Sequence, residues 1–147
     1  FERGGSSVST RLKVDMAELN MMLRDLPEEH ELKKRTAITT IEVDALSQME
    51  TNMQAKVASG KTPGAGSSLM KMMASSLGQQ IATLQMETKA NYSIPHNNKL
   101  LLEGQDTIGR KQGQTATANY LNERASSIFG GAREVQKNII AKSVLGL

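Results

Sequence analysis

The sequence contains no cysteine, only four aromatic residues and no long apolar run. Without cysteine, the chain can build neither a disulfide framework nor a thiolate site for zinc or an iron–sulfur cluster. No apolar run approaches the roughly 20 residues that a membrane-spanning helix needs, so we expect no membrane partner. Since the sequence also shows no secretory signal, we expect a cytoplasmic protein.

Charge of either sign is not concentrated in one part of the chain. The 18 basic and 15 acidic residues give a net charge of +3, and residues 1–36 alone carry seven of each sign. A chain with no basic stripe and few aromatic side chains has little with which to bind phosphates or stack bases, so we expect no nucleic-acid partner. His30 and His96 are far apart, and neither has a second ligand at metal-binding spacing, so we also expect no metal site.

What the sequence does contain is a succession of helical patterns separated by glycine and proline. The first pattern has apolar residues at spacings of four, three and four, namely Leu12, Met16, Leu19 and Leu23. This spacing predicts an amphipathic helix that begins after the Gly4-Gly5 pair and ends before Pro27.

A second, longer helix is predicted from about Glu28 to Ser59. Pro27 suits a first helical position, and Gly60 suits the residue that follows a helix end. The apolar residues of this segment recur at spacings of three and four, which predicts that they form a face buried in a bundle. These residues are Ile38, Ile41, Ala45, Met49, Met53 and Val57.

A third helix is predicted after the glycine-rich segment at residues 60–66. This segment lacks the residue order and the preceding strand of a phosphate-binding loop, so we interpret it as an ordinary turn between helices. Ser67 or Ser68 can cap the helix, which must end before Pro95. Its apolar residues are Leu69, Met73, Leu77, Ile81 and Leu84.

The rest of the sequence predicts a long polar connection and two shorter helices. The connection covers residues 93–114, and the helices run from about Thr115 to Ile128 and from Ala132 to Val144, with Gly130-Gly131 between them. No segment shows the strict alternation of a β-strand. The sequence therefore predicts an all-α fold, an antiparallel helical bundle formed by residues 1–147 as one domain.

Three segments carry a resemblance to a known family. The last 20 residues read IFGGAREVQKNIIAKSVLGL, which resembles the closing helix of the acyl-CoA dehydrogenase family, with its aromatic residue, tight glycine turn and Leu-Gly-Leu tail. Residues 32–88, which include the sequence SSLMK, resemble the two long bundle helices of that family. The opening FERGG resembles the start of the first helix of its C-terminal domain.

The resemblance implies that residues 1–147 are the C-terminal domain of a longer chain with three domains, and that this domain is an antiparallel four-helix bundle. It implies an FAD-dependent enzyme, of the kind found in fatty-acid metabolism, that oxidises the Cα–Cβ bond of an acyl-CoA thioester to the 2,3-enoyl form. It further implies a homotetramer built as a dimer of dimers, with electron-transfer flavoprotein as the electron acceptor. The isolated domain is expected to be inactive, because the domain that covers the flavin is absent from it.

The resemblance also assigns the residues that act on the substrate. The family uses a carboxylate to remove the α-proton, and this carboxylate lies either in the turn before the last helix or on the first bundle helix, just before an arginine. The turn here has Gly130 at the first position, which cannot act as a base, and Glu2 followed by Arg3 occupies the second. We therefore expect Glu2 to be the catalytic base, and Arg3 and Gly130 to contact the substrate. The alternative is that Glu2 is a solvated carboxylate at a helix end.

The glycine turn before the last helix is expected to bind the adenosine half of FAD. Backbone N–H groups at the start of a helix favour anions and close approach of a ligand. In the family, a threonine and an acidic or amide residue two positions later contact the cofactor, and the resemblance places Ala132 and Glu134 there, beside Gly131. Glu134 can accept hydrogen bonds from ribose hydroxyls, whereas Ala132 lacks the hydroxyl that the family places at this position.

Two further departures leave other functions open. Arg24 is not followed by the Phe-Gly of the family's FAD-contacting arginine, and residues 93–114 lack the family's Gln-x-x-Gly-Gly flavin loop. These features resemble bacterial members that act on steroid side chains or dicarboxylic acids, some of them heteromeric. The alternatives are therefore a non-catalytic subunit that completes a partner's FAD site, and an acyl-CoA oxidase or flavin monooxygenase on the same fold.

Overall fold

The computed structural model describes residues 8–90 and 115–146, and within them every regular element is helical. Three long helices come first, α1 (Val8–Met22), α2 (Glu31–Ala58) and α3 (Gly66–Lys89). The second described range contains α5 (Ala116–Glu123), the 3₁₀ turn η3 (Arg124–Ser127), α6 (Arg133–Ile140) and the π-helical turn η4 (Ala141–Leu145).

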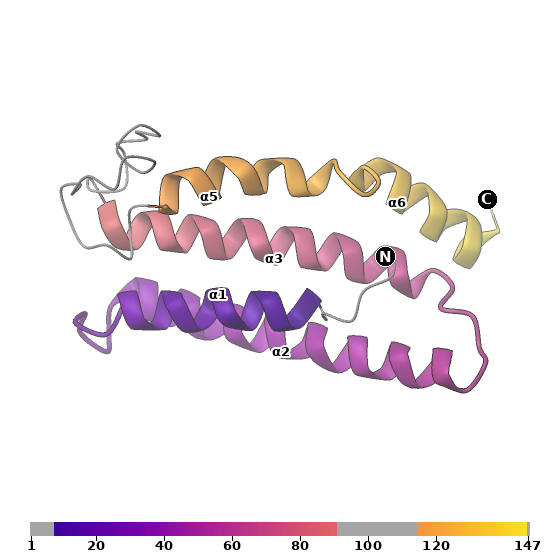
Figure 1. The fold of residues 1–147 in the computed structure, drawn as a ribbon, viewed down its shortest axis with the longest axis horizontal. Helices are drawn as coiled ribbons and strands as arrows, with labels where there is room; N and C mark the ends of the chain where they lie inside the picture. The colour runs from indigo at the N-terminus through magenta and orange to yellow at the C-terminus, as the bar shows by residue number, and fades with distance from the viewer. Residues whose placement is uncertain (1–7, 91–114, 147) are drawn as a thin grey trace.

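The long helices lie side by side and alternate in direction, as Figure 1 shows. Helix α3 packs against both α1 and α2 and also against α5 and α6. Because α5 and α6 follow one another along α3, the two short helices together form the fourth rod of the bundle (Figure 1). The predicted all-α antiparallel four-helix bundle is confirmed, with its last rod divided in two.

The core lies between α1, α2 and α3 and consists of leucine, isoleucine, valine and methionine. Its buried members are Leu12, Met16, Leu19, Leu23, Val43, Leu46, Met70, Leu77, Ile81 and Leu84. The apolar residues predicted for the first helix are all among them, as are three of the five predicted for the third. Met73 packs against this core from a partly buried position, whereas Leu69 is exposed.

The prediction of which face of α2 is buried is wrong, because the buried face lies on another side of the helix. Ile38 and Ile41 are 57% and 70% exposed, and Ala45 and Val57 are exposed as well. Only Met49 and Met53, which are partly buried against the core, agree with the prediction. The residues that α2 buries are Thr36, Thr39, Val43, Leu46 and Glu50.

The inner face of α2 is polar at three positions. Thr39 and Glu50 find side-chain partners inside the bundle, whereas the buried Thr36 hydroxyl has none in the described part of the chain. The Thr39 hydroxyl donates to the Arg35 carbonyl at 2.9 Å and accepts from the Gln80 amide at 2.7 Å. The Glu50 carboxylate accepts two backbone N–H groups of α1. Buried polar groups with partners cost little, so the periodicity of apolar residues alone gave the wrong face.

Two predicted helix starts are displaced by a few residues. Helix α2 begins at Glu31 rather than next to Pro27, because the His30 side chain accepts the N–H of Leu32 at 3.2 Å and acts as the N-cap. Helix α3 begins at Gly66, and Ser67 donates to the Gly64 carbonyl at 3.1 Å from inside the first turn instead of capping the helix. The predicted connection at 93–114 lies outside the described residues.

None of the helices in the described ranges is long and apolar enough to cross a membrane.

Candidate functional site

The candidate site is built on the turn between η3 and α6, where the predicted break at Gly130-Gly131 is confirmed. Gly130 and Gly131 have φ angles of +66° and +102°, a backbone region that L residues with side chains rarely adopt. A Cβ added at Gly131 would also overlap the side-chain amide of Gln136. The backbone conformation therefore favours glycine at Gly131, and a side chain there would also require the Gln136 side chain to move.

The residues predicted to contact substrate and cofactor gather at this turn. Gly130 and Glu134 are exposed, and Gly131 and Ala132 are partly buried. Ala132 is the N-cap residue of α6, and its side chain makes no capping hydrogen bond to the first N–H groups of that helix. The start of α6 can therefore bind an acceptor group of a ligand, while the negative charge of Glu134 suits hydroxyl groups better than a second anion.

Side chains from α3 fasten this turn to the bundle. The Lys71 ammonium donates to the carbonyl of Ser126 at 3.2 Å and to the carbonyl of Gly131 at 2.7 Å. The Arg133 guanidinium donates to the Ser76 hydroxyl at 2.8 Å. The turn is therefore attached to α3 both before and after its two glycines.

Gln79, farther along α3, fastens η3 to the same helix. Its side-chain amide donates to the carbonyls of Glu123 and Arg124 at 3.0 and 3.4 Å. Arg124 donates in return to the Gln79 carbonyl at 3.1 Å and lies 4.3 Å from the centroid of the Tyr120 ring. These bonds fix the segment that leads into the turn.

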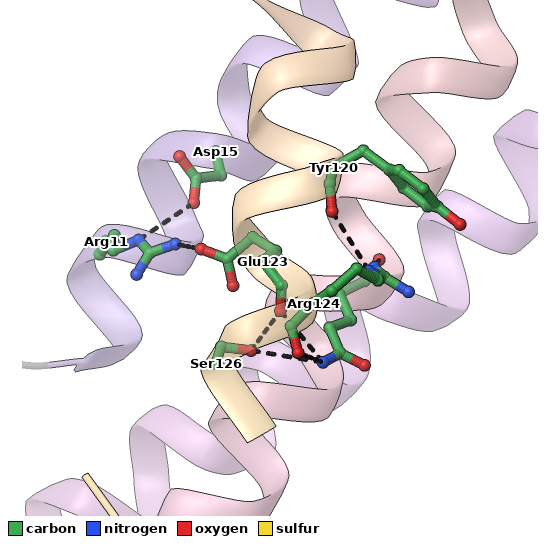
Figure 2. A network of polar contacts seen from close by, with 7 residues as sticks. Arg11, Asp15, Tyr120, Glu123, Arg124 and Ser126 are labelled. Atoms are coloured by element: carbon green, nitrogen blue, oxygen red, sulfur yellow. Dashed lines mark hydrogen bonds and ion pairs between the residues drawn. The ribbon is translucent and has the colours of Figure 1, made fainter. Parts of the chain in front are cut away.

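A buried carboxylate connects α5 to α1. Glu123 is only 7% exposed and is ion-paired with Arg11, which also lies 3.6 Å from Asp15 (Figure 2). Burial raises the pKa of the Asp15 carboxyl; Arg11 opposes this, and the charges of Glu123 and Glu18 add to it.

Glu50 fixes the beginning of α1. Its two carboxylate oxygens accept the N–H groups of Val8 at 3.0 Å and Ser9 at 3.2 Å, so a side chain of α2 caps the first turn of α1. The predicted catalytic residue Glu2 and its neighbour Arg3 lie outside the described residues. The structure thus brings together Gly130, Gly131, Ala132 and Glu134, and the positions of Glu2 and Arg3 stay predictions.

Within residues 8–90 and 115–146, no group of three histidine, aspartate or glutamate side chains is placed to hold a metal ion.

Sequence reasoning missed the residues that support the site. Lys71 belongs to the SSLMK sequence, but nothing local indicates that its partners lie 55 and 60 residues away. Glu50 and Glu123 are charged residues on core-facing positions, and this is recognisable only once the rotation of each helix is known. The one local signal in the sequence was Gly78, because an isolated glycine inside a helix often marks a position that a neighbouring element approaches closely.

Comparison with protein families identifies the family of this chain. The family model described as acyl-CoA dehydrogenase, C-terminal domain, matches residues 20–145. The matched region includes the glycine turn and its supports on α3, while Glu2 and Arg3 precede it. No curated protein and no solved structure gives a significant match.

Proposed function

Because the chain belongs to the family of acyl-CoA dehydrogenase C-terminal domains, we propose that it is the C-terminal part of a longer FAD-dependent enzyme. The proposed reaction converts the Cα–Cβ bond of an acyl-CoA thioester to the 2,3-enoyl form. The observation that carries this proposal is the glycine turn with an uncapped helix start, inside the region that matches the family.

The residues of the turn fit the adenosine half of FAD. The start of α6 offers backbone N–H groups, and Glu134 offers an exposed carboxylate that can accept hydrogen bonds from ribose hydroxyls. The Nε of Arg133 is a buried donor with no partner in the described part of the chain, so a ligand acceptor there would satisfy it. Bound FAD would supply the acceptor for the hydride that leaves Cβ.

The proposed base is Glu2, which takes the α-proton while the β-hydride leaves. Gly130 has no group that can accept a proton, so the turn itself cannot provide the base. Arg3 is proposed to bind the CoA portion, because its guanidinium suits a phosphate or carbonyl partner. The cap that Glu50 provides at Val8 fixes the chain six residues after Glu2.

The test of this function is the Glu2→Gln variant of the full chain. We expect turnover of an acyl-CoA with an artificial electron acceptor to fall about 10²- to 10⁴-fold, the range typical for loss of a general base, with flavin content unchanged. Glu29→Gln, at an exposed position, is the matched control. Full turnover by Glu2→Gln would contradict the assignment, and turnover by residues 1–147 alone would contradict the need for further domains.

A second candidate function is supported by Ala132, whose side chain lacks the hydroxyl expected at a cofactor-binding position. We propose as the alternative a non-catalytic subunit that completes the FAD site of a partner. Colourless purified protein, together with complex activity that survives Glu2→Gln, would favour this alternative. Oxygen consumption during turnover would instead favour an acyl-CoA oxidase or flavin monooxygenase over an enzyme that passes electrons to electron-transfer flavoprotein.

A further inference from the structure

We propose that Lys71 is a positioning residue that holds the glycine turn in the conformation that receives the cofactor. This inference rests on the proposed function for the cofactor, but the holding role itself rests on the contacts of Lys71 alone. Lys71 lies on α3 and is partly buried.

The two bonds of Lys71 enclose the most flexible part of the turn. One partner is the carbonyl of Ser126 before the glycines, and the other is the carbonyl of Gly131. Glycine has more backbone freedom than any other residue, so two consecutive glycines at positive φ need an outside restraint to keep one conformation. A single ammonium group that bonds both carbonyls provides this restraint.

The bond to Gly131 also determines the direction of a backbone donor. The described residues contain no cis peptide bond, and in a trans peptide the C=O and N–H groups point in opposite directions. Because the Gly131 carbonyl points to Lys71, the N–H of Ala132 in the same peptide unit points away from α3. Lys71 therefore orients, without touching the ligand, the first donor at the start of α6.

A second tie supports the same arrangement from the other side. Arg133, the first residue of α6, donates to Ser76, which lies five residues after Lys71 on α3. Helix α6 contains no buried residue, so packing alone holds it weakly. Lys71 and Ser76 thus add polar bonds to the limited packing of α6 on α3.

The test compares Lys71→Met, which keeps the apolar stem, with Lys71→Arg, which keeps the charge, both in the full chain. The first readout is amide hydrogen exchange of residues 127–136 without FAD, and the second is the dissociation constant of FAD from flavin fluorescence. We expect Lys71→Met to raise exchange in the turn and to weaken FAD binding about tenfold, which is the effect of losing roughly one charge-assisted hydrogen bond. Lys71→Arg should retain most of both properties.

Two controls keep the result specific. Lys34→Met removes an exposed lysine of α2 and should change neither readout. Ser76→Ala removes only the acceptor of Arg133, at an exposed position, so it should raise amide exchange at the start of α6. This variant remains informative if Lys71→Met folds poorly.

The outcomes separate this inference from the proposed function. Unchanged exchange in the turn of Lys71→Met, or equal loss of FAD affinity in Lys34→Met, would overturn the positioning role. Wild-type protein that binds no FAD, while Lys71→Met still raises exchange in the turn, would overturn the proposed function and leave the holding role supported.

Discussion

Among single residues in the described part of the chain, Asp15 has an ionisation that opposes folding. Its carboxyl is partly buried between α1 and α5, and burial raises its pKa above the usual value of 3.8 even though Arg11 is close by. A carboxyl whose pKa is higher in the folded state stabilises the fold only while it is protonated. Its contribution is therefore complete below about pH 3.8 and is lost as the pH rises through the raised folded value.

Asp15→Asn should therefore raise the free energy of unfolding at pH 7 and change it much less at pH 3.5, where most of the wild-type carboxyl is protonated in both states. Urea unfolding of both proteins at the two pH values measures the difference. Glu29→Gln, at an exposed position, should show no comparable change. A lower stability of Asp15→Asn at pH 7 would mean that the attraction of Arg11 outweighs the cost of burial.

At the scale of elements, Gly78 sets how closely α5 approaches α3. The glycine is buried, and a Cβ at this position would lie 2.8 Å from a carboxylate oxygen of Glu123 and 3.8 Å from Leu12. Glu123 cannot move away freely, because it is ion-paired with Arg11. The Glu123 carboxylate thus occupies the space that a side chain at position 78 would need.

Gly78→Ala should destabilise the chain by about 1–3 kcal/mol, the usual cost of overpacking, although alanine favours a helix by about 1 kcal/mol over glycine. The measurement is urea unfolding in a double-mutant cycle with Glu123→Ala. In the Glu123→Ala background the same substitution should become neutral or stabilising, since the clashing carboxylate is gone. Equal destabilisation in both backgrounds would place the clash elsewhere.

The elements also show which features a sequence can reveal. The rods, their order and the glycine turn were predictable, because apolar spacing and glycine act locally. The inner face of α2 was not, since Thr39 and Glu50 are buried with partners on other helices. The supports of the turn were equally hidden, because Lys71 meets carbonyls that only the finished bundle brings close.

For the whole molecule, the exposed face of α2, which apolar spacing had predicted to be buried, indicates where another subunit could bind. Ile38, Ile41 and Ala45 form a row on the outside of the bundle, and the two isoleucines are more than half exposed. Apolar side chains grouped in this way commonly mark a surface that another subunit covers. We propose that this outer row of α2 contributes to the dimer of dimers expected for the parent enzyme.

Ile41→Glu in the full chain should therefore shift the assembly toward dimers or monomers, because a charge would be buried in the subunit contact. Light scattering coupled to size-exclusion chromatography measures the change. Circular dichroism should show the helical content unchanged, since Ile41 lies outside the core. Thr51→Glu, at an exposed position on another side of α2, serves as the matched control, and an unaltered tetramer in Ile41→Glu would exclude the outer row from the interface.

The absence of buried residues in α6 has a consequence for affinity at the turn. Because α6 has no buried residue and is tied to α3 by polar bonds, loss of these bonds would lower the fraction of molecules in which this helix is docked. A ligand that requires the docked form binds with its intrinsic dissociation constant divided by the docked fraction. The affinity for a ligand at the turn therefore depends partly on residues of α3 that do not contact the ligand. A substitution of these residues can change the affinity without altering the binding surface.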